Sequence, residues 1–413
     1  MLSPMSEHLR TTELRGRGAP DRLVVVFSDI EMGAGGRYDD FLRSDFLAEI
    51  IRGYGRDPYR WLAVDLVFNG DTFDLLKTRS RGGWPTHVTR DIGIDKMEQV
   101  ASAHPAFFEA VREHLAADPA RRRAFFVVGN HDMELLFPEV QAVVRDRLGS
   151  PENVRFPGLE VDLGRVHIEH GSQLDPLFIV DPERPFIESK AGAKILGLSW
   201  ASVALLEVAI PLQPLLYHHD RLKPKELVLE LIPEVRELLI GEFWTYWTRR
   251  YFRDLVAGDP LKSVSWTMVK ELVRRLVSWE VDVEMGDSLQ RRMMQSEHFD
   301  LYLVGHQHEP GWWSHGQRKV LRTGCIRDEF MLVERGRAQV PINKTWAEVY
   351  LRGDDVVRSH LVEHIAPERP PGTYPASIFE VVPEVRERLS AQRDAIGSQK
   401  DAQDAQEARE RDG

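Results

Sequence analysis

The sequence predicts an α/β domain that carries a helical insertion, and three observations lead to this fold class. Short runs of β-branched and other apolar residues recur along the chain, as is typical of buried strands. Segments with helical periodicity lie between the first three of these runs, so strands and helices alternate. A long stretch, residues 176–297, then shows helical periodicity without a comparable strand pattern.

The predicted strands are short apolar runs of similar length. They span Leu23–Phe27, Val64–Phe68, Ala124–Val128, Val166–Glu169 and Leu301–Val304. Helical patterns lie between the first three, at Asp95–Ala116 and Met133–Arg147. Strands that alternate with helices predict a sheet covered on both faces. Further β-like runs follow at Lys319–Arg322 and Trp346–Leu351.

Composition divides the chain into segments. A polar leader covers residues 1–20, and one domain covers residues 21–365, with the helical insertion 176–297 inside it. Apolar residues of the insertion repeat at helical spacing in two groups: Leu227, Leu231, Val235 and Leu238, and Trp266, Val269, Leu272 and Leu276. Residues 366–413 form a charged tail, which we expect to be partly disordered because large apolar residues become rare toward its end.

The overall composition limits the class of protein. Of 413 residues, 42% are hydrophobic and 29% charged, which is the balance of a soluble globular protein. The formal net charge of −11 disfavours nucleic-acid binding, since no basic patch is evident. The N-terminus lacks the apolar core of a signal peptide, and Cys325 has no cysteine partner, so we expect a cytoplasmic protein.

One apolar segment leaves a membrane location open. Ile195–Tyr217 contains a single charge, Glu207, and is long enough to cross a bilayer. A carboxylate inside the membrane is costly, however, and Pro211 and Pro214 interrupt a helix there. The segment is either a buried or interfacial helix, which we favour, or a membrane span.

Each of the five apolar runs ends in a cluster of residue types that bind metals. The clusters are Ser28-Asp29-Ile30-Glu31, Asn69-Gly70-Asp71, Gly129-Asn130-His131-Asp132, His170-Gly171 and Gly305-His306-Gln307-His308. Ligands of α/β sheets bind at the carboxyl ends of strands, so these loops are expected to converge. Carboxylate, amide oxygen and imidazole together suit manganese, iron, zinc or cobalt. Two such cations need a bridging carboxylate, for which Asp71 is the natural candidate.

The series SDIE, GDTFD, GNHD, HG and GHQH resembles the motifs of the calcineurin-like metallophosphoesterases, and it extends over Leu23–Gly324 apart from the insertion. The resemblance implies a β-sandwich flanked by helices. It also implies two divalent metal ions, with manganese favoured and iron, zinc, cobalt or magnesium as alternatives. The expected activity is the hydrolysis of a phosphoric ester.

The resemblance assigns roles to individual residues of this chain. The first metal would be held by Asp29, Asp71 and His308, and the second by Asp71, Asn130, His170 and His306. His131 matches the catalytic histidine, and Asn130 also contacts the substrate. Asp74 is favoured as the carboxylate that orients His131, with Asp132 as the competing candidate.

The chain departs from the family pattern at Glu31, where a histidine is usual. Glutamate can coordinate the first metal through oxygen, as we expect here, or point away and weaken that site. Lys77, Arg79 and Arg81 follow GDTFD and are either contacts for a second phosphate or solvated. The sequence His218-His219-Asp220 in the insertion is expected to be a solvated loop.

The substrate is less defined than the chemistry. GDTFD is not followed by Arg-Gly, which disfavours a phosphoprotein substrate. The motif set is most similar to bacterial UDP-2,3-diacylglucosamine hydrolases, which cleave a pyrophosphate in a lipid precursor and carry a helical insertion. The favoured hypothesis is therefore hydrolysis of a phosphodiester or pyrophosphate in a lipid-linked or nucleotide-linked substrate, with the insertion in peripheral contact with a membrane.

Two alternatives remain. One is a soluble phosphatase or phosphodiesterase for a small molecule or nucleic acid, whose insertion is a lid or a homodimer interface. The other is a metal-binding scaffold without catalytic activity.

Overall fold

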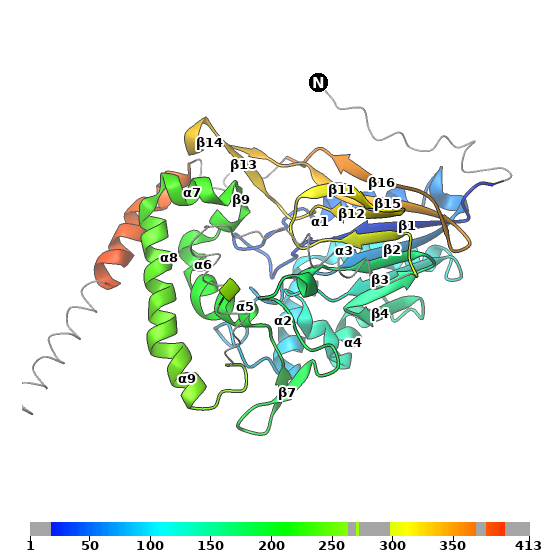
Figure 1. Cartoon of the computed structure of the whole chain (residues 1–413). Coiled ribbons are helices and arrows are strands. Elements are labelled where there is room, and N and C mark those ends of the chain that lie inside the picture. The colour runs from blue at the N-terminus through cyan, green and yellow to red at the C-terminus, as the bar shows by residue number, and fades with distance from the viewer. Residues whose placement is uncertain (1–17, 263–269, 272–297, 369–376, 393–413) are drawn as a thin grey trace, which may run out of the picture.

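Two large β-sheets, two small ones and a set of helices build the molecule, seen in a computed structural model that describes residues 18–262, 270–271, 298–368 and 377–392. The sheets lie together on one side, and most helices of the insertion lie on the other (Figure 1). The predicted leader, apart from residues 18–20, lies outside the described residues. So does almost all of the second predicted helical face, from Trp266 to Leu276.

The larger sheet has six strands in the order β16-β15-β1-β2-β3-β4. Their bounds are β1 Arg22–Phe27, β2 Ala63–Asn69, β3 Arg122–Val127, β4 Val154–Gly158, β15 Lys344–Arg352 and β16 Asp355–His364. Strands β1 to β4 pair in parallel, with Phe27 opposite Phe68 and Asn69 opposite Val127. This register brings the carboxyl ends of three strands to one edge of the sheet.

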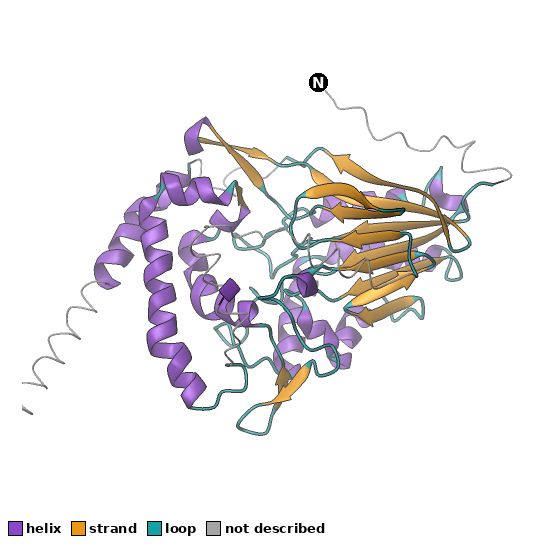
Figure 2. Cartoon of the chain, viewed as in Figure 1, coloured by secondary structure: helices purple, strands orange, loops and turns teal. Residues whose placement is uncertain are grey.

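The smaller sheet has five strands in the order β11-β12-β10-β6-β5. Their bounds are β5 Glu160–Leu163, β6 Val166–Glu169, β10 Leu301–Val304, β11 Pro310–His315 and β12 Arg318–Thr323. Strands β6, β10 and β12 are parallel, and Val304 lies opposite Glu169. The two sheets form a sandwich, with helices packed on the outer face of the larger one (Figure 2). The predicted α/β sandwich is confirmed.

Alternation along the strands produces two cores. In β1, Val24 and Val26 point between the sheets, where they join apolar residues of β2, β3, β6, β10 and β15. Leu23, Val25 and Phe27 point the other way, into the core shared with the helices. A strand that is buried on both faces reads as a continuous apolar run, which explains the pattern LVVVF.

Prolines divide the helices more finely than the sequence pattern predicts. The helices beside the larger sheet are α1 Ser44–Gly53, α2 Arg90–Ala103, α3 Pro105–Ala117 and α4 Pro138–Arg147. The predicted helix Asp95–Ala116 is thus two helices, and Met133–Arg147 is a 3₁₀ turn, Met133–Leu136, followed by α4. Pro105 and Pro138 each begin a new helix because proline lacks the N–H that would continue the preceding one.

The insertion combines helices with short strands. Its elements are β7 Phe186–Glu188, β8 Lys194–Leu196, α5 Trp200–Ala204, α6 Gln213–Leu216, β9 Leu222–Lys223, α7 Lys225–Leu231, α8 Pro233–Thr245 and α9 Phe252–Val256. Strand β9 pairs with β13 Phe330–Val333, which also pairs with β14 Ala338–Pro341. The insertion is therefore joined to the segment that follows the last predicted motif.

Part of the predicted tail also packs against the insertion. Residues 382–392 are helical, and Val385 and Leu389 are buried beside Val235 and Leu238 of α8. Residues 393–413 lie outside the described residues.

The apolar segment Ile195–Tyr217 is broken into several helical pieces. Beyond α5 it continues as a π-helical turn, Leu205–Ala209, a 3₁₀ turn, Ile210–Leu212, and then α6. Val203, Leu206 and Ile210 pack into the core of the domain. Among the described residues, every helix is too short or too polar to reach across a bilayer.

Candidate metal centre

The loops that follow five strands meet at one end of the sandwich and are joined by backbone hydrogen bonds. The N–H groups of Ile30 and Glu31 donate to the carbonyl of Asp71 at 3.0 and 2.8 Å. The N–H of Gly305 donates to the carbonyl of His170 at 2.8 Å. The N–H of Ile326, after β12 of the smaller sheet, donates to the carbonyl of Asp29, after β1 of the larger sheet, at 3.1 Å. Bonds within and between the sheets thus make residues distant in sequence neighbours.

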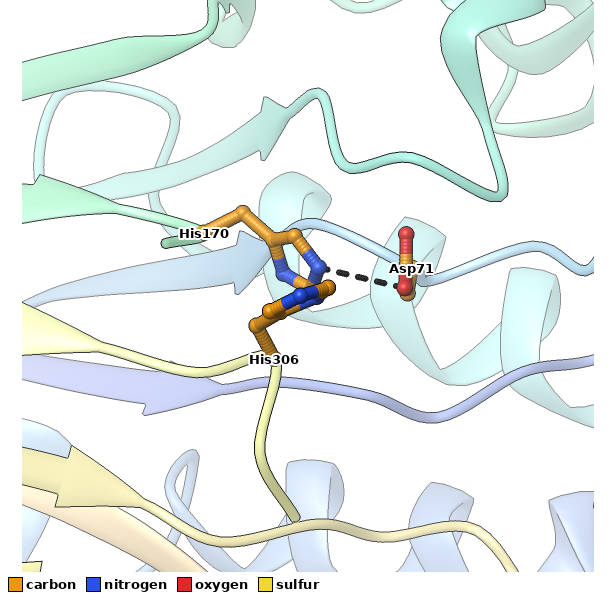
Figure 3. A group of neighbouring side chains, drawn as sticks. All are labelled: Asp71, His170 and His306. Carbon is orange, nitrogen blue, oxygen red and sulfur yellow. Dashed lines mark ion pairs between the residues drawn. The ribbon is translucent and has the colours of Figure 1, made fainter. Parts of the chain in front are cut away.

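Asp71, His170 and His306 form one cluster of donor atoms. Oδ2 of Asp71 lies 3.1 Å from Nε2 of His170, and the His306 ring lies beside both (Figure 3). Oδ1 of Asn130 lies 3.2 Å from the same nitrogen of His170. Nδ1 of His170 is 3.1 Å from the carbonyl of Asn69, which leaves Nε2 facing the cluster. All four residues expected to hold the second metal are therefore together.

Asp29, Glu31 and His308 form another cluster beside that of Asp71, and it is named the first cluster because these residues are the expected ligands of the first metal. Nε2 of His308 lies 3.3 Å from Oδ1 of Asp29 and 3.4 Å from Oε1 of Glu31. Nδ1 of His308 lies 2.7 Å from Oε1 of Glu329. A carboxylate behind a histidine is the usual support of a metal ligand, because it fixes the ring and its tautomer. Asp29, Glu31 and His308, three of the residues expected to hold the first metal, thus meet here, and backbone hydrogen bonds join the Glu31 loop to Asp71, the fourth.

Glu31 is buried and bound by two cations. Nη1 of Arg327 lies 2.6 and 2.7 Å from its two carboxylate oxygens, and Nζ of Lys77 lies 2.9 Å from Oε2. Burial opposes the charged form, but the Arg327 guanidinium and the Lys77 ammonium lower the pKa of Glu31 well below its ordinary value. Glu31 therefore points into the site as a carboxylate.

His131 and Asp74 form a hydrogen-bonded pair at the edge of the first cluster. Nδ1 of His131 lies 2.9 Å from Oδ1 of Asp74. Burial disfavours the imidazolium, but the carboxylates of Asp71, Glu31 and Asp74 raise the pKa of His131 to about 10. The pair leaves Nε2 of a protonated ring for other partners.

Asp132 has a different position from Asp74. Its two oxygens accept the backbone N–H groups of Gly129 at 2.7 Å and Thr72 at 2.8 Å. It joins the loop after β2 to the loop after β3. Of the two predicted orienters, Asp74 is the one that contacts the imidazole.

The candidate ligands have an unusual backbone. Left-handed φ values occur at Asp29, Glu31, Asp71, His306 and His308. Side chains other than glycine rarely adopt this conformation, and it costs about 1–3 kcal/mol per residue. Such strain clusters at functional sites, where the surrounding structure maintains it.

Gly305 shows how closely these loops approach one another. A Cβ at this position would lie 1.9 Å from Oγ of Ser28 and 2.6 Å from Oδ2 of Asp29. Only glycine lets β10 end so near the loop that carries Asp29.

The residues fit a pair of transition-metal ions. Oδ1 of Asp29 is buried and receives no hydrogen bond from the described residues, although burying an unpaired carboxylate oxygen is costly. Carboxylates, an amide oxygen and imidazoles converge around it and around Asp71, and this donor set suits manganese, iron, zinc or cobalt. A cation at each cluster would satisfy these atoms.

The predicted phosphate-binding residues are dispersed. Nζ of Lys77 contacts Glu31, Asp40, Asp74 and Asp220, so its charge is compensated within the protein. Arg79 is exposed and stacks on the Trp84 ring at 4.2 Å. Arg81 is exposed and lines a separate surface pocket with Arg90 and Lys194.

The expectation for His218-His219-Asp220 was wrong. Both histidines are buried, and burial is the main cause that lowers their pKa values, to about 3 and about 4. Oδ2 of Asp220 lies 3.0 Å from Lys77 Nζ and 3.3 Å from Arg327 Nη2. The two histidines are buried, whereas Asp220 stays partly exposed and joins the charged network beside the first cluster.

Sequence reasoning missed Arg327, Glu329 and Asp40. Arg327 and Glu329 follow strand β12, in the order Cys325-Ile326-Arg327-Asp328-Glu329. A polar group after an apolar run was the signal that identified the other loops, and it was present here too. Asp40 had no such signal; it lies in the loop before α1, close to Lys77 and Arg221.

A cavity of about 340 Å³ adjoins His131. His131, Lys77, His219 and Asp220 form its polar wall, whereas the insertion supplies an apolar wall. The apolar wall includes Leu205, Ile210, Leu216, Val228, Leu229, Val235 and Leu239. Its volume falls within the range of small-molecule sites, about 300–1,000 Å³.

Comparison with known proteins gives similarity to solved structures alone. No protein-family model matches the chain. No curated protein matches it either. The similar structures include a dimetal phosphatase from Danio rerio, with 11% identity over 84% of this chain and 99% of that chain, at a TM-score of 0.33. A predicted phosphoesterase from Streptococcus pneumoniae has 12% identity over 83% of this chain and 97% of that one, at a TM-score of 0.25. A putative 5′-nucleotidase from Staphylococcus aureus has 14% identity over 89% of this chain and 58% of that one, at a TM-score of 0.30.

Proposed function

We propose that this chain is a metal-dependent phosphoesterase with a dinuclear centre. The observation that carries the proposal is two neighbouring donor clusters, Asp71 with His170 and His306 and Asp29 with Glu31 and His308, beside the pair of His131 and Asp74. The first metal would be held by Asp29, Glu31, Asp71 and His308, and the second by Asp71, Asn130, His170 and His306. Bound there, divalent cations would supply Lewis-acid stabilisation of the phosphoryl group and activation of water.

His131 has the role of general acid in this proposal. Asp74 accepts a hydrogen bond from Nδ1–H of His131, and this bond fixes the ring. The proton on Nε2 is then available to the leaving oxygen of the ester. Burial opposes the charge, but the carboxylates of Asp71, Glu31 and Asp74 raise the pKa of His131 and so favour the protonated ring. The leaving group would lie at the polar wall of the cavity, which includes His131.

The cavity supports a substrate with an apolar arm. Many of the residues that line it are aliphatic side chains of the insertion, and such surface favours the burial of hydrocarbon. We therefore propose a phosphodiester or pyrophosphate with one apolar group, as in a lipid-linked substrate. A water-soluble phosphate ester would leave this cavity unfilled.

A surface of the insertion supports contact with an anionic membrane. Trp244, Phe252 and Val256 are 60%, 48% and 87% exposed along α8 and α9. Arg249 and Arg253 are exposed between them. Aromatic and aliphatic side chains next to arginines are typical of helices that lie on anionic bilayers. Co-sedimentation with anionic vesicles should therefore be stronger than with neutral ones, and binding equal to both would contradict the contact.

The experiment for the activity is a metal-supplemented substrate screen on the purified full chain. Phosphomonoesters, diesters and nucleotide–lipid pyrophosphates are compared at matched concentrations, with manganese, zinc, cobalt or magnesium added separately. We expect turnover of a diester or pyrophosphate that disappears on chelation and returns with metal. Full turnover by protein shown by elemental analysis to be metal-free would refute the proposal, and absence of turnover with two bound metals would favour the scaffold alternative.

A further inference from the structure

Arg327 lies behind every ligand of the first cluster. Its side chain is 3% exposed, and Nη1 donates to both oxygens of Glu31 at 2.6 and 2.7 Å. Nη2 lies 3.2 Å from the carbonyl oxygen and 3.3 Å from Oδ2 of Asp220, and Nε lies 3.6 Å from Oε1 of Glu329. The guanidinium is thus held on several sides and has little freedom to move away from Glu31.

The same residue reaches the other two ligands of this cluster. Its backbone N–H donates to the carbonyl of Asp29 at 3.0 Å. The Glu329 oxygen that faces its Nε also lies 2.7 Å from Nδ1 of His308. Arg327 therefore contacts Asp29 through its backbone, Glu31 through its side chain and His308 through Glu329.

The charge of Glu31 makes this arrangement necessary. A buried carboxylate is strongly destabilising unless a cation and hydrogen bonds compensate it. A neutral imidazole at position 31 would need no guanidinium, and a guanidinium left without Glu31 would repel a nearby metal ion. Glu31 and Arg327 therefore depend on each other.

The geometry separates the roles of Arg327 and Lys77. Lys77 is also near Glu31, but its flexible ammonium is shared with Asp40, Asp74 and Asp220. The planar guanidinium of Arg327 presents several donors in a fixed arrangement. With Glu31 bound in this way, Oε1 of Glu31 lies 3.4 Å from Nε2 of His308. The same nitrogen lies 3.3 Å from Oδ1 of Asp29.

We propose that Arg327 is the positioning residue of the first metal site: it holds Glu31, in place of a neutral ligand, so that Glu31 coordinates together with Asp29 and His308. The proposal rests on the dinuclear centre proposed above. It predicts that the first metal depends on Arg327 although the guanidinium does not touch the ion, and that the second metal does not.

The first experiment measures metal content in Arg327→Met and Arg327→Lys. The purified full-length variants are equilibrated with limiting manganese, and bound metal is counted by elemental analysis. We expect two equivalents in the wild type. In Arg327→Met the affinity for one of the two equivalents should fall about 10- to 100-fold, the usual effect of losing a residue that supports a ligand. Arg327→Lys keeps a positive charge without the fork of donors, so a smaller loss of the same equivalent is expected.

Arg221→Met is the matched control. Arg221 is also buried, and its Nε lies 2.5 Å from Oδ1 of Asp40 in the same charged network. The described contacts of its side chain do not include Glu31, Glu329 or His308. Its removal should lower the melting temperature yet leave both metal equivalents bound. If Arg327→Met does not fold by circular dichroism, Arg327→Lys decides.

Exchange of both partners gives the most specific test. Glu31→His alone should lose the same metal equivalent, because Arg327 loses its nearest carboxylate and its charge stays beside the site. Glu31→His combined with Arg327→Met should bind that metal more tightly than Glu31→His does, by about tenfold or more. No recovery in the double variant would overturn the pairing.

The outcomes distinguish this inference from the proposed function. Two metals in the wild type and unchanged binding in both Arg327 variants would overturn the inference and leave the function standing. Loss of the same equivalent in Arg221→Met would also overturn it, because any damage to the network would then suffice. A wild-type chain that binds no divalent metal would overturn the function itself.

Discussion

Replacing Asp74 by asparagine tests the proposed general acid with little change in shape. Oδ1 of Asp74 lies 2.9 Å from Nδ1 of His131 and also accepts the N–H of Lys77 at 3.1 Å. A hydrogen bond to a charged group contributes about 1.5–3 kcal/mol. If the bond acts fully in the transition state, its loss lowers turnover about 10- to 150-fold. His131→Ala removes the acid itself and should cost about 10²- to 10⁴-fold.

The pH profile gives a second and more specific readout. Asp74 is one of the carboxylates that raise the pKa of His131 to about 10, against the effect of burial. Asparagine is neutral, so the pKa of His131 should fall in this variant. Activity needs the protonated ring and is lost as the pH rises through its pKa. The alkaline limb of the rate profile should therefore move to lower pH.

The assay is turnover of a chromogenic bis-ester between about pH 6 and 10.5, with metal content measured on the same samples. Asp132→Asn is the comparison, because Asp132 binds backbone N–H groups of Gly129 and Thr72 instead of His131. It should lower stability without moving the alkaline limb. An unmoved limb in Asp74→Asn, or metal loss in His131→Ala, would refute the assigned roles.

Three further predictions concern the close-packed loop, the cavity and a buried histidine. Gly305→Ala should lower metal occupancy and melting temperature, because its Cβ would lie 2.6 Å from Oδ2 of Asp29; elemental analysis and calorimetry measure both. Val228→Trp should fill the cavity and raise KM about tenfold or more for long-chain esters, while KM for methyl esters stays unchanged. Burial and the guanidinium of Arg122 lower the pKa of His114 to about 4. The unfolded chain then binds more protons between pH 6.5 and 4, so stability is lost as the pH falls through this window, by up to about 3 kcal/mol. In urea unfolding, His114→Gln should reduce that loss.

Each of these predictions has a contradicting result. Normal metal content in Gly305→Ala would show that Asp29 can move without consequence. An equal change of KM for short and long esters would show that the cavity does not bind the long chain of the substrate. An unchanged pH dependence in His114→Gln would show that other groups cause the acid sensitivity.

Much of the fold could be predicted because the strand signal is local. The runs Val166–Glu169 and Leu301–Val304 coincide with β6 and β10. The segments with helical periodicity are indeed helical. Two helices were predicted as one, however, where a proline separates them, as at Pro105. The short edge strands β5 and β11 lacked an apolar run, since alternate residues of both are exposed, and they were not predicted.

The residues of the candidate site could be named for the same local reason. Each follows a strand within a few positions, and parallel strands place their carboxyl ends together. Residue type then determined the chemistry: carboxylates, an amide and imidazoles are metal donors wherever they meet. To that extent the sequence by itself determined the architecture, the donor set and the type of reaction proposed.

Only the tertiary structure decided how the charges pair. Glu31 and Arg327 are 296 positions apart, and no periodicity connects them. Their contact exists because two sheets and the insertion enclose both side chains, where a lone charge could not remain. The structure also decided that Lys77 is compensated by carboxylates and that aliphatic residues of the insertion line the same cavity as His131. Hydrophobic patterns act over neighbouring residues, whereas ion pairing and cavities depend on which distant surfaces the fold brings together.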